Sequence, residues 1–299
     1  MTTPDFIPPA VRARLKGLRL TARNAAGGHG FGLHSSRSRG AGLEFAQYRA
    51  YEPGDEPRQI DWKLYARSDR FFVREAERDS PLTVWLLIDA TASMAQGDAA
   101  RPHWSRLEAA KGLAACVIEL ALRQGDRFGI VAVGGESLQL AAAGSGPRQR
   151  DRCLLQLQGL KAQGQWPAEA QLRPVWERIG AGALVLLLSD GFDEHCLTLA
   201  ERLAAARREV LHVQILTTEE RDFPFRGGYR FRDPETGSEL LTDGAAARDD
   251  FLQRFASARA ALSSRLAASG IRHAEFVLDQ DLDAPLRSLF ARHAALGVA

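Results

Sequence analysis

Two apolar runs that each end in an aspartate constrain the fold of this chain more than any other feature. The first is TVWLLID, at residues 83–89, and the second is ALVLLLSD, at residues 183–190. A near-continuous apolar run of this length is typical of a parallel strand that is buried on both faces. Such strands occur where helices cover both sides of a sheet. The two runs therefore predict the centre of a mostly parallel sheet.

Helical and strand patterns alternate along the rest of this region. Between 104 and 125, apolar residues recur at spacings of three and four, and Gly125 is placed to end the helix. Further helices are expected near 148–161, 168–179, 197–208, 245–269 and 283–294, and further strands at 127–134, 136–143, 209–217 and 271–279. Strands that alternate with helices of this length predict an α/β fold with a doubly wound, mostly parallel sheet of the Rossmann type.

The first part of the chain differs in texture from the rest. The stretch GGHGFGLHSSRSRGAG, at 27–42, is rich in glycine and predicts irregular backbone. Residues 57–67 are predicted to form a short helix with proline in its first turn, and residues 71–77 a strand. We therefore expect two parts, an N-terminal segment over 1–80 that packs on an α/β domain over 81–299.

Composition narrows the classes of function. A net charge of +2 over 299 residues gives no global field that would attract nucleic acid. No stretch approaches the roughly 18 apolar residues of a membrane span, and no apolar signal segment opens the chain. The three cysteines, Cys116, Cys153 and Cys196, have no close pairing and fit reduced, buried thiols. We expect a cytoplasmic protein without a nucleic-acid partner or a membrane span.

Positive charge gathers near the N-terminus, however. The first forty residues contain Asp5 as their one acid and seven basic residues, which are Arg12, Arg14, Lys16, Arg19, Arg23, Arg37 and Arg39. Such a segment is either an anion-binding segment or a solvated basic face, and the sequence leaves both interpretations open.

Oxygen-bearing side chains follow the two apolar strands. Asp89, Thr91 and Ser93 alternate in LLIDATAS, and Asp190 ends the second strand. Ligands of doubly wound sheets bind at the carboxyl edge of the strands, where both aspartates are expected. Oxygen ligands suit Mg²⁺, Mn²⁺ or Ca²⁺, so a metal site is one hypothesis. A second is that Asp89 and Ser93 only satisfy the backbone where the strand becomes a loop.

A third interpretation is enzymatic. The two acidic strand ends are similar to those of haloacid-dehalogenase-like, magnesium-dependent phosphatases, with Asp89 as the nucleophile. In that family a general acid usually stands two residues later, and Thr91 occupies its place here. The family's lysine has only weak candidates, such as Lys161. A non-enzymatic function is therefore favoured over the phosphatase.

A more specific signature lies upstream of these strands. Residues 44–67 read EFAQYRAYEPGDEPRQIDWKLYAR, and VREAE follows at 73–77. Together with FPFRGGYRFRDPETGSELLTD, at 223–243, these motifs resemble the domain-of-unknown-function 58 family (DUF58) over about residues 15–295. A loop or small hairpin is expected at 221–243, as an insertion in the α/β domain.

The resemblance implies a fold and a function. The fold is a von Willebrand factor type A-like domain with an appended N-terminal segment. The function is that of a non-enzymatic protein-binding module, which acts with a MoxR-type AAA+ ATPase in chaperone-like assembly or maturation. The resemblance does not identify the client protein.

The resemblance also implies a metal-ion-dependent adhesion site. Thr91 and Ser93 would bind Mg²⁺ directly, and Asp89 and Asp190 would bind it mainly through water. A partner's carboxylate would complete the shell. The family takes a further threonine from a loop that corresponds to residues near Gln165, where this chain has none. That departure implies a weakened or empty site.

The signature segment supplies candidate partner-binding residues. Arg58 and Trp62 are four apart, so on one helix the guanidinium would stack on the indole. Lys63 and Arg67 would share a helix face and could dock an acidic partner surface. The alternative is an internal charge network that holds the segment in place.

Overall fold

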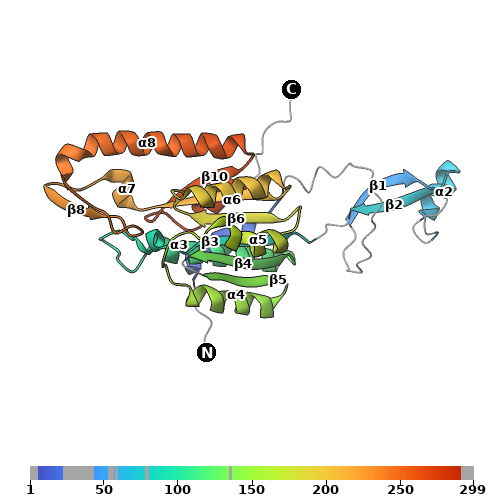
Figure 1. The fold of residues 1–299 in the computed structure, drawn as a ribbon. Helices are drawn as coiled ribbons and strands as arrows, with labels where there is room; N and C mark the ends of the chain where they lie inside the picture. The colour runs from blue at the N-terminus through green and yellow to red at the C-terminus, as the bar shows by residue number, and fades with distance from the viewer. Residues whose placement is uncertain are drawn as a thin grey trace, which may run out of the picture. The chain divides into compact units, whose positions relative to one another are not determined.

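The chain forms two units in a computed structural model (Figure 1). The structure describes residues 6–22, 44–52, 57, 60–77, 81–134 and 137–290, without the side chains of 44–49, 74–77 and 137. One unit combines residues 1–28 with 82–299, and the other holds residues 29–81. The packing of one unit on the other stays a prediction.

The larger unit is built on a sheet with the strand order β10-β7-β6-β3-β4-β5. Its strands are β3 (Thr83–Asp89), β4 (Arg127–Gly134), β5 (Ser137–Gly144), β6 (Leu184–Ser189), β7 (Glu209–Leu216) and β10 (Arg272–Val277). Neighbours pair in parallel, except that β4 and β5 are antiparallel. The chain enters at the centre and later crosses to the other half, so a topological switch point lies between β3 and β6. This order confirms the predicted doubly wound α/β fold.

Helices cover both faces of this sheet (Figure 1). One layer contains α1 (Pro9–Arg14), α3 (Arg106–Gln124), α4 (Pro147–Gly159) and α9 (Ala284–Phe290). The other contains α5 (Arg173–Arg178), α6 (Glu194–Ala205) and α8 (Gly244–Ala268). Successive strand residues face opposite layers, as Leu86 and Leu87 do, which explains why the strands are apolar throughout. Among the described helices, none combines the length and the apolar character needed to cross a membrane.

Helix α3 is the best-defined element of the first layer. Its N-terminus is capped by Ser105, whose Oγ accepts the Glu108 N–H at 3.3 Å. Its C-terminus is followed by Gly125 in the left-handed conformation, at φ 75°. That conformation favours glycine, which has no Cβ to clash, and the predicted end of the helix is confirmed.

Helix α1 belongs to the larger unit, whereas the sequence predicted it as part of an N-terminal segment over 1–80 that packs on the α/β domain. Val11 and Leu15 are buried in the same core as α3. Arg12 forms an ion pair with Glu119 at 3.0 Å, and Arg14 pairs with the buried Asp283 at 2.7 Å. Apolar burial and ion pairs to distant residues therefore fasten α1 to the α/β domain.

The smaller unit consists of β1 (Glu44–Ala50), antiparallel to β2 (Phe72–Glu77), and helix α2 (Trp62–Ser68). The strand predicted at 71–77 is confirmed, but the helix predicted from residue 57 begins only at Trp62. Asp61 sets that start, because its Oδ1 accepts the backbone N–H groups of Lys63 and Leu64 at 2.9 and 3.1 Å.

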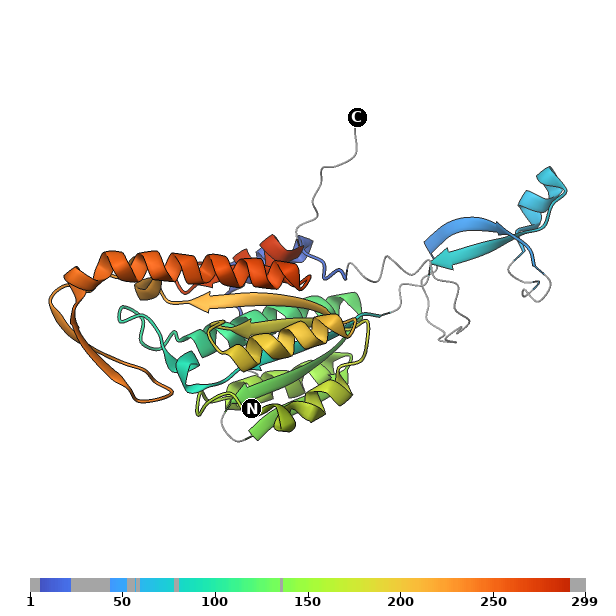
Figure 2. The ribbon, with the colours of Figure 1, turned by 45° about the horizontal axis from the view of Figure 1, so that its top comes forward.

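The segment predicted as a loop or small hairpin forms a hairpin (Figure 2). It follows helix α7 (Thr218–Asp222) and pairs β8 (Gly228–Arg232) with β9 (Glu239–Asp243). Gly227 and Gly237 have φ values of 87° and 73°, a left-handed conformation that favours glycine. In Figure 2 the hairpin lies beneath the first turns of α8.

A glycine at the end of β4 makes a close contact that no larger residue can keep. A Cβ on Gly134 would lie 2.2 Å from the carbonyl oxygen of Ala90. Ala90 cannot easily move, because its N–H donates to Val133 at 2.7 Å and its oxygen accepts from Gln163 at 2.9 Å. We therefore expect Gly134→Ala to lower the free energy of unfolding by about 1–3 kcal/mol in urea denaturation.

Gly159 provides the matched control, because a Cβ there meets nothing within 4 Å. Gly159→Ala should leave the stability unchanged or raise it by about 0.5–1 kcal/mol, since it lies at the end of helix α4. Equal effects of the two substitutions would contradict the steric argument at Gly134.

Candidate functional site

The four predicted site residues come together at the carboxyl edge of β3 and β6. These strands pair in parallel, with Ile88 opposite Leu188, so Asp89 and Asp190 follow at the same edge. Thr91 and Ser93 lie in the loop after β3, within hydrogen-bond distance of each other at 3.1 Å between their hydroxyl oxygens. The expectation that both aspartates lie at the carboxyl edge of the sheet is confirmed, and their strands are neighbours.

Asp89 is enclosed by its own hydrogen bonds and is only 1% exposed. Its Oδ1 accepts the hydroxyl of Thr91 at 2.7 Å and the Thr91 N–H at 3.0 Å. Its Oδ2 accepts the hydroxyl of Ser189 at 2.8 Å. Burial, followed by the neighbouring Asp190 carboxylate, raises the pKa of Asp89 to about 7. Asp89 therefore satisfies the backbone of the loop, and both of its oxygens are used inside the protein.

A buried arginine holds the second aspartate. The Nη1 of Arg106 donates to Asp190 Oδ2 at 3.1 Å and to the carbonyl oxygen of Ser93 at 3.1 Å. Its Nη2 donates to Glu220, in the capping box of α7. The side chain of Arg106 is 2% exposed. One guanidinium thus joins the loop after β3, the end of β6 and helix α7.

Sequence reasoning did not find Arg106 or Glu220. A weak signal was present, because Arg106 is the first residue of α3, where the positive end of the helix dipole disfavours a cation. A basic residue in that position indicates nearby acids. The identity of those acids depends on the fold.

The residues fit Mg²⁺ only in part. The hydroxyl oxygens of Thr91 and Ser93 are 3.1 Å apart. This is close to the separation of about 3 Å expected for two adjacent ligands, each about 2.1 Å from an octahedral Mg²⁺. Asp190, in contrast, is already paired with Arg106, and its Oδ1 accepts the Phe192 N–H at 3.2 Å. A metal ion beside the guanidinium would be repelled, so the arginine opposes tight binding.

The loop near Gln165, which supplies a further threonine in the family that the chain resembles and has none here, lies beside the site. The Ala92 N–H donates to the carbonyl oxygen of Gly164 at 2.8 Å. The side chain of Gln165 donates to the backbone oxygen of Glu235 at 3.1 Å, in the hairpin, and Trp166 is buried in the core. Among the described residues, no three His, Cys, Asp or Glu side chains are grouped for metal binding. Mg²⁺ stays a prediction of the resemblance.

A cavity of about 290 Å³ opens next to these residues. It is lined by Ser93, Gln96, Arg106, Asp190, Phe192, Asp193, Glu220, Asp233, Pro234 and Glu235. The turn of the β8–β9 hairpin thus contributes one wall. Asp89 and Thr91 are buried behind the cavity, whereas Ser93 and Asp190 line it.

The predicted partner-binding residues belong to the smaller unit. Trp62, Lys63 and Arg67 are exposed on α2, and Trp62 is 58% exposed. Arg58 lies outside the described residues. Its predicted stacking on Trp62 required a shared helix, and α2 begins only at Trp62. Lys63 and Arg67 are four apart within α2, as their predicted common face requires.

Solved structures with a similar arrangement include an aerotolerance-related membrane protein from Bacteroides fragilis NCTC 9343, with a TM-score of 0.45, 15% identity, and coverage of 69% of this chain and 95% of that chain. The SpRpn10 VWA domain has a TM-score of 0.39 and 14% identity, over 74% of this chain and 100% of that chain. These likenesses are weak, so the fold assignment rests on the strand order of the sheet.

Sequence comparisons extend over most of the chain. The uncharacterized protein Rv1480 of Mycobacterium tuberculosis (strain H37Rv) is 28% identical over 293 residues, which cover 94% of this chain and 89% of that protein. The uncharacterized protein Mb1516 of Mycobacterium bovis has the same identity and coverage. A family profile described as "Protein of unknown function DUF58" matches residues 47–261. This match covers well over half of the chain, which therefore belongs to the DUF58 family.

Proposed function

We propose that the chain is a non-enzymatic protein-binding module that recognises a partner at the carboxyl edge of β3 and β6. The observation that carries this proposal is the division of the edge into enclosed and open groups. Asp89 and Thr91 are buried and hydrogen-bonded to each other, and Asp190 is buried and paired with Arg106, whereas Ser93 is half-buried and lines the cavity. Such an arrangement presents a fixed polar surface to a partner and keeps the carboxylate of Asp89 away from it.

The same observation disfavours the phosphatase alternative. A nucleophilic carboxylate must reach the phosphorus atom of its substrate. Both oxygens of Asp89 accept hydrogen bonds, from Thr91 and from Ser189, and the residue is 1% exposed. The position of the general acid is taken by Thr91, whose hydroxyl donates to Asp89. Neither group is placed for phosphoryl transfer.

The partner in this proposal is a MoxR-type AAA+ ATPase, as the family resemblance implies, and its client is a protein that awaits maturation. Helix α2 would supply a second contact. Lys63 and Arg67 suit an acidic partner surface, and Trp62 offers an exposed aromatic ring. Mg²⁺ held by Thr91 and Ser93 is a separate prediction, because Arg106 already supplies a fixed positive charge next to Asp190.

The proposal is tested by binding of the purified MoxR-type ATPase from the same organism, with and without Mg²⁺. We expect Ser93→Ala to weaken binding about tenfold, which corresponds to about 1.4 kcal/mol. Ser257→Ala is the matched control, because that hydroxyl is exposed on α8 and donates only within its helix among the described residues. Unchanged binding by folded Ser93→Ala, or phosphomonoester hydrolysis that Asp89→Asn abolishes, would show that the proposal is wrong.

A further inference from the structure

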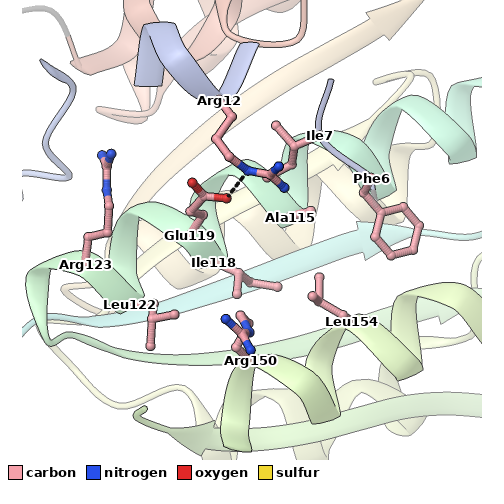
Figure 3. A pocket seen from close by; sticks show the side chains of 10 residues that line it. All are labelled: Phe6, Ile7, Arg12, Ala115, Ile118, Glu119, Leu122, Arg123, Arg150 and Leu154. Atoms are coloured by element: carbon pink, nitrogen blue, oxygen red, sulfur yellow. Dashed lines mark hydrogen bonds and ion pairs between the residues drawn. The ribbon is translucent and has the colours of Figure 1, made fainter. Parts of the chain in front are cut away.

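A groove in the helical layer that contains α1, α3 and α4 shares no residue with the candidate site at the carboxyl edge of β3 and β6. It has a volume of about 570 Å³ and lies between α3, α4 and the residues that lead into α1 (Figure 3). Its lining consists of Phe6, Ile7, Arg12, Ala115, Ile118, Glu119, Leu122, Arg123, Arg150 and Leu154. The residues come from three elements that are far apart in the sequence.

The floor of the groove is apolar. Ala115, Ile118 and Leu122 recur at spacings of three and four, so they form one stripe on α3. Leu154 of α4 and Phe6 add apolar surface at the sides, and Leu122, Leu154 and Phe6 are only partly buried. Ala115 and Ile118 are only 3% and 1% exposed, so the apolar surface that is open to a partner is that of Leu122, Leu154 and Phe6.

The rim of the groove is cationic. Arg12, Arg123 and Arg150 stand around the floor, one from each of the three elements, with Glu119 as the one acid in the lining (Figure 3). Arg12 pairs with Glu119, and Arg150 pairs with the adjacent Asp151 at 2.8 Å. The lining therefore carries an excess of positive charge.

Two of these arginines retain hydrogen-bonding capacity. A guanidinium has five N–H donors. In the described structure, Arg123 donates through Nη2 to the backbone oxygen of Leu15 at 2.7 Å, and Arg150 reaches Asp151 through Nε and Nη2. Their other N–H groups can bind the carboxylates of a ligand.

The surroundings of the groove are also basic. Residues 6–22 contain no acidic residue, and Lys16 and Arg19 are exposed beyond α1. Arg148 and Arg152 are exposed on α4. A groove within such a field attracts and orients an anionic partner.

We propose that this groove binds an acidic amphipathic helix of a partner protein. Apolar side chains of the partner would pack on Leu122, Leu154 and Phe6, and its carboxylates would pair with Arg123 and Arg150. A groove walled by helices offers no unpaired strand edge, so a helix laid into it is the fitting mode of recognition. This surface shares no residue with the candidate site at the carboxyl edge, and the exposed Lys16 and Arg19 of the N-terminal segment add to the positive field around it.

The test uses the full chain and a fluorescein-labelled helical peptide of leucine and glutamate, with leucine at the i, i+3, i+4 and i+7 positions. Fluorescence anisotropy should show salt-dependent binding to the wild type. The double variant Arg123→Glu/Arg150→Glu should bind the peptide at least about tenfold more weakly. The matched control is Arg173→Glu/Arg254→Glu, two exposed arginines of other helices, which should bind as the wild type does.

A second peptide, with lysine in place of glutamate, should prefer the double variant over the wild type, and circular dichroism establishes that both chains are folded. Equal binding of the acidic peptide by wild type and double variant would overturn the proposal. It would also be overturned if the wild type bound phosphatidylglycerol vesicles and not the peptide. Self-association in sedimentation that the double variant abolishes would assign the groove to a second copy of the chain instead.

Discussion

Replacing Arg106 with methionine is expected to lower the free energy of unfolding by about 3–5 kcal/mol, measured by urea denaturation. The guanidinium pairs with Asp190 and Glu220, and its side chain is only 2% exposed. Methionine preserves much of the volume but leaves the buried Asp190 without its cation. The cost therefore comes from an uncompensated charge and not from a cavity.

Two further variants test whether the loss of stability comes from the uncompensated charge of the buried acids. Arg173→Met removes an arginine that is 81% exposed and pairs within its own helix, so it should change stability by less than about 1 kcal/mol. Adding Asp190→Asn and Glu220→Gln to Arg106→Met should recover most of the loss, because the acids no longer need a cation. A loss below about 1 kcal/mol for Arg106→Met would contradict the buried ion pair.

Acid is expected to destabilise the protein through His212. This histidine is buried in β7, its ring stacks on His273 at a centroid distance of 5.2 Å, and their Nδ1 atoms are 3.2 Å apart. Burial, and then the neighbouring His273, lowers the pKa of His212 from 6.5 to about 3. The folded protein therefore keeps this imidazole neutral over a range in which the unfolded chain binds a proton.

The sign and size of the effect follow from that difference. The contribution of His212 to stability is complete above pH 6.5 and is lost as the pH falls toward 3. Its upper bound is about 4–5 kcal/mol, at 1.36 kcal/mol for each pKa unit. Urea denaturation between pH 7 and pH 4 should show a shallower loss of stability in His212→Asn than in the wild type.

The test compares how steeply stability falls with pH in the two proteins. The smaller asparagine side chain lowers stability by the same amount at every pH, so it does not affect this comparison. His195→Asn, at an exposed position on α6, should retain the steep pH dependence of the wild type. If His212→Asn and the wild type lost stability in parallel, the buried neutral histidine would not be the cause.

Local sequence patterns predicted where the candidate site lies in the sheet. The aspartates at the ends of two buried strands fixed the edge, because parallel strands end on the same side of a sheet. The start of α2 was wrong by five residues, since the cap formed by Asp61 outweighed the proline at position 57. The predicted helix over 168–179 is shorter, with a 3₁₀ turn at Glu169–Leu172 before α5. The ends of these helices depend on individual hydrogen bonds, which the apolar periodicity of the sequence does not show.

The sequence by itself determined the doubly wound sheet and the edge at which the candidate site lies. Apolar side chains on both faces of TVWLLID and ALVLLLSD can be buried only between two layers of helices. Only the tertiary structure decided which residue neutralises the negative charge of Asp190 at that edge. Arg106 reaches Asp190 across 84 positions of the chain and Glu220 across 114. Contacts of this separation arise from the way the helices pack on the sheet, and a local pattern carries no record of them.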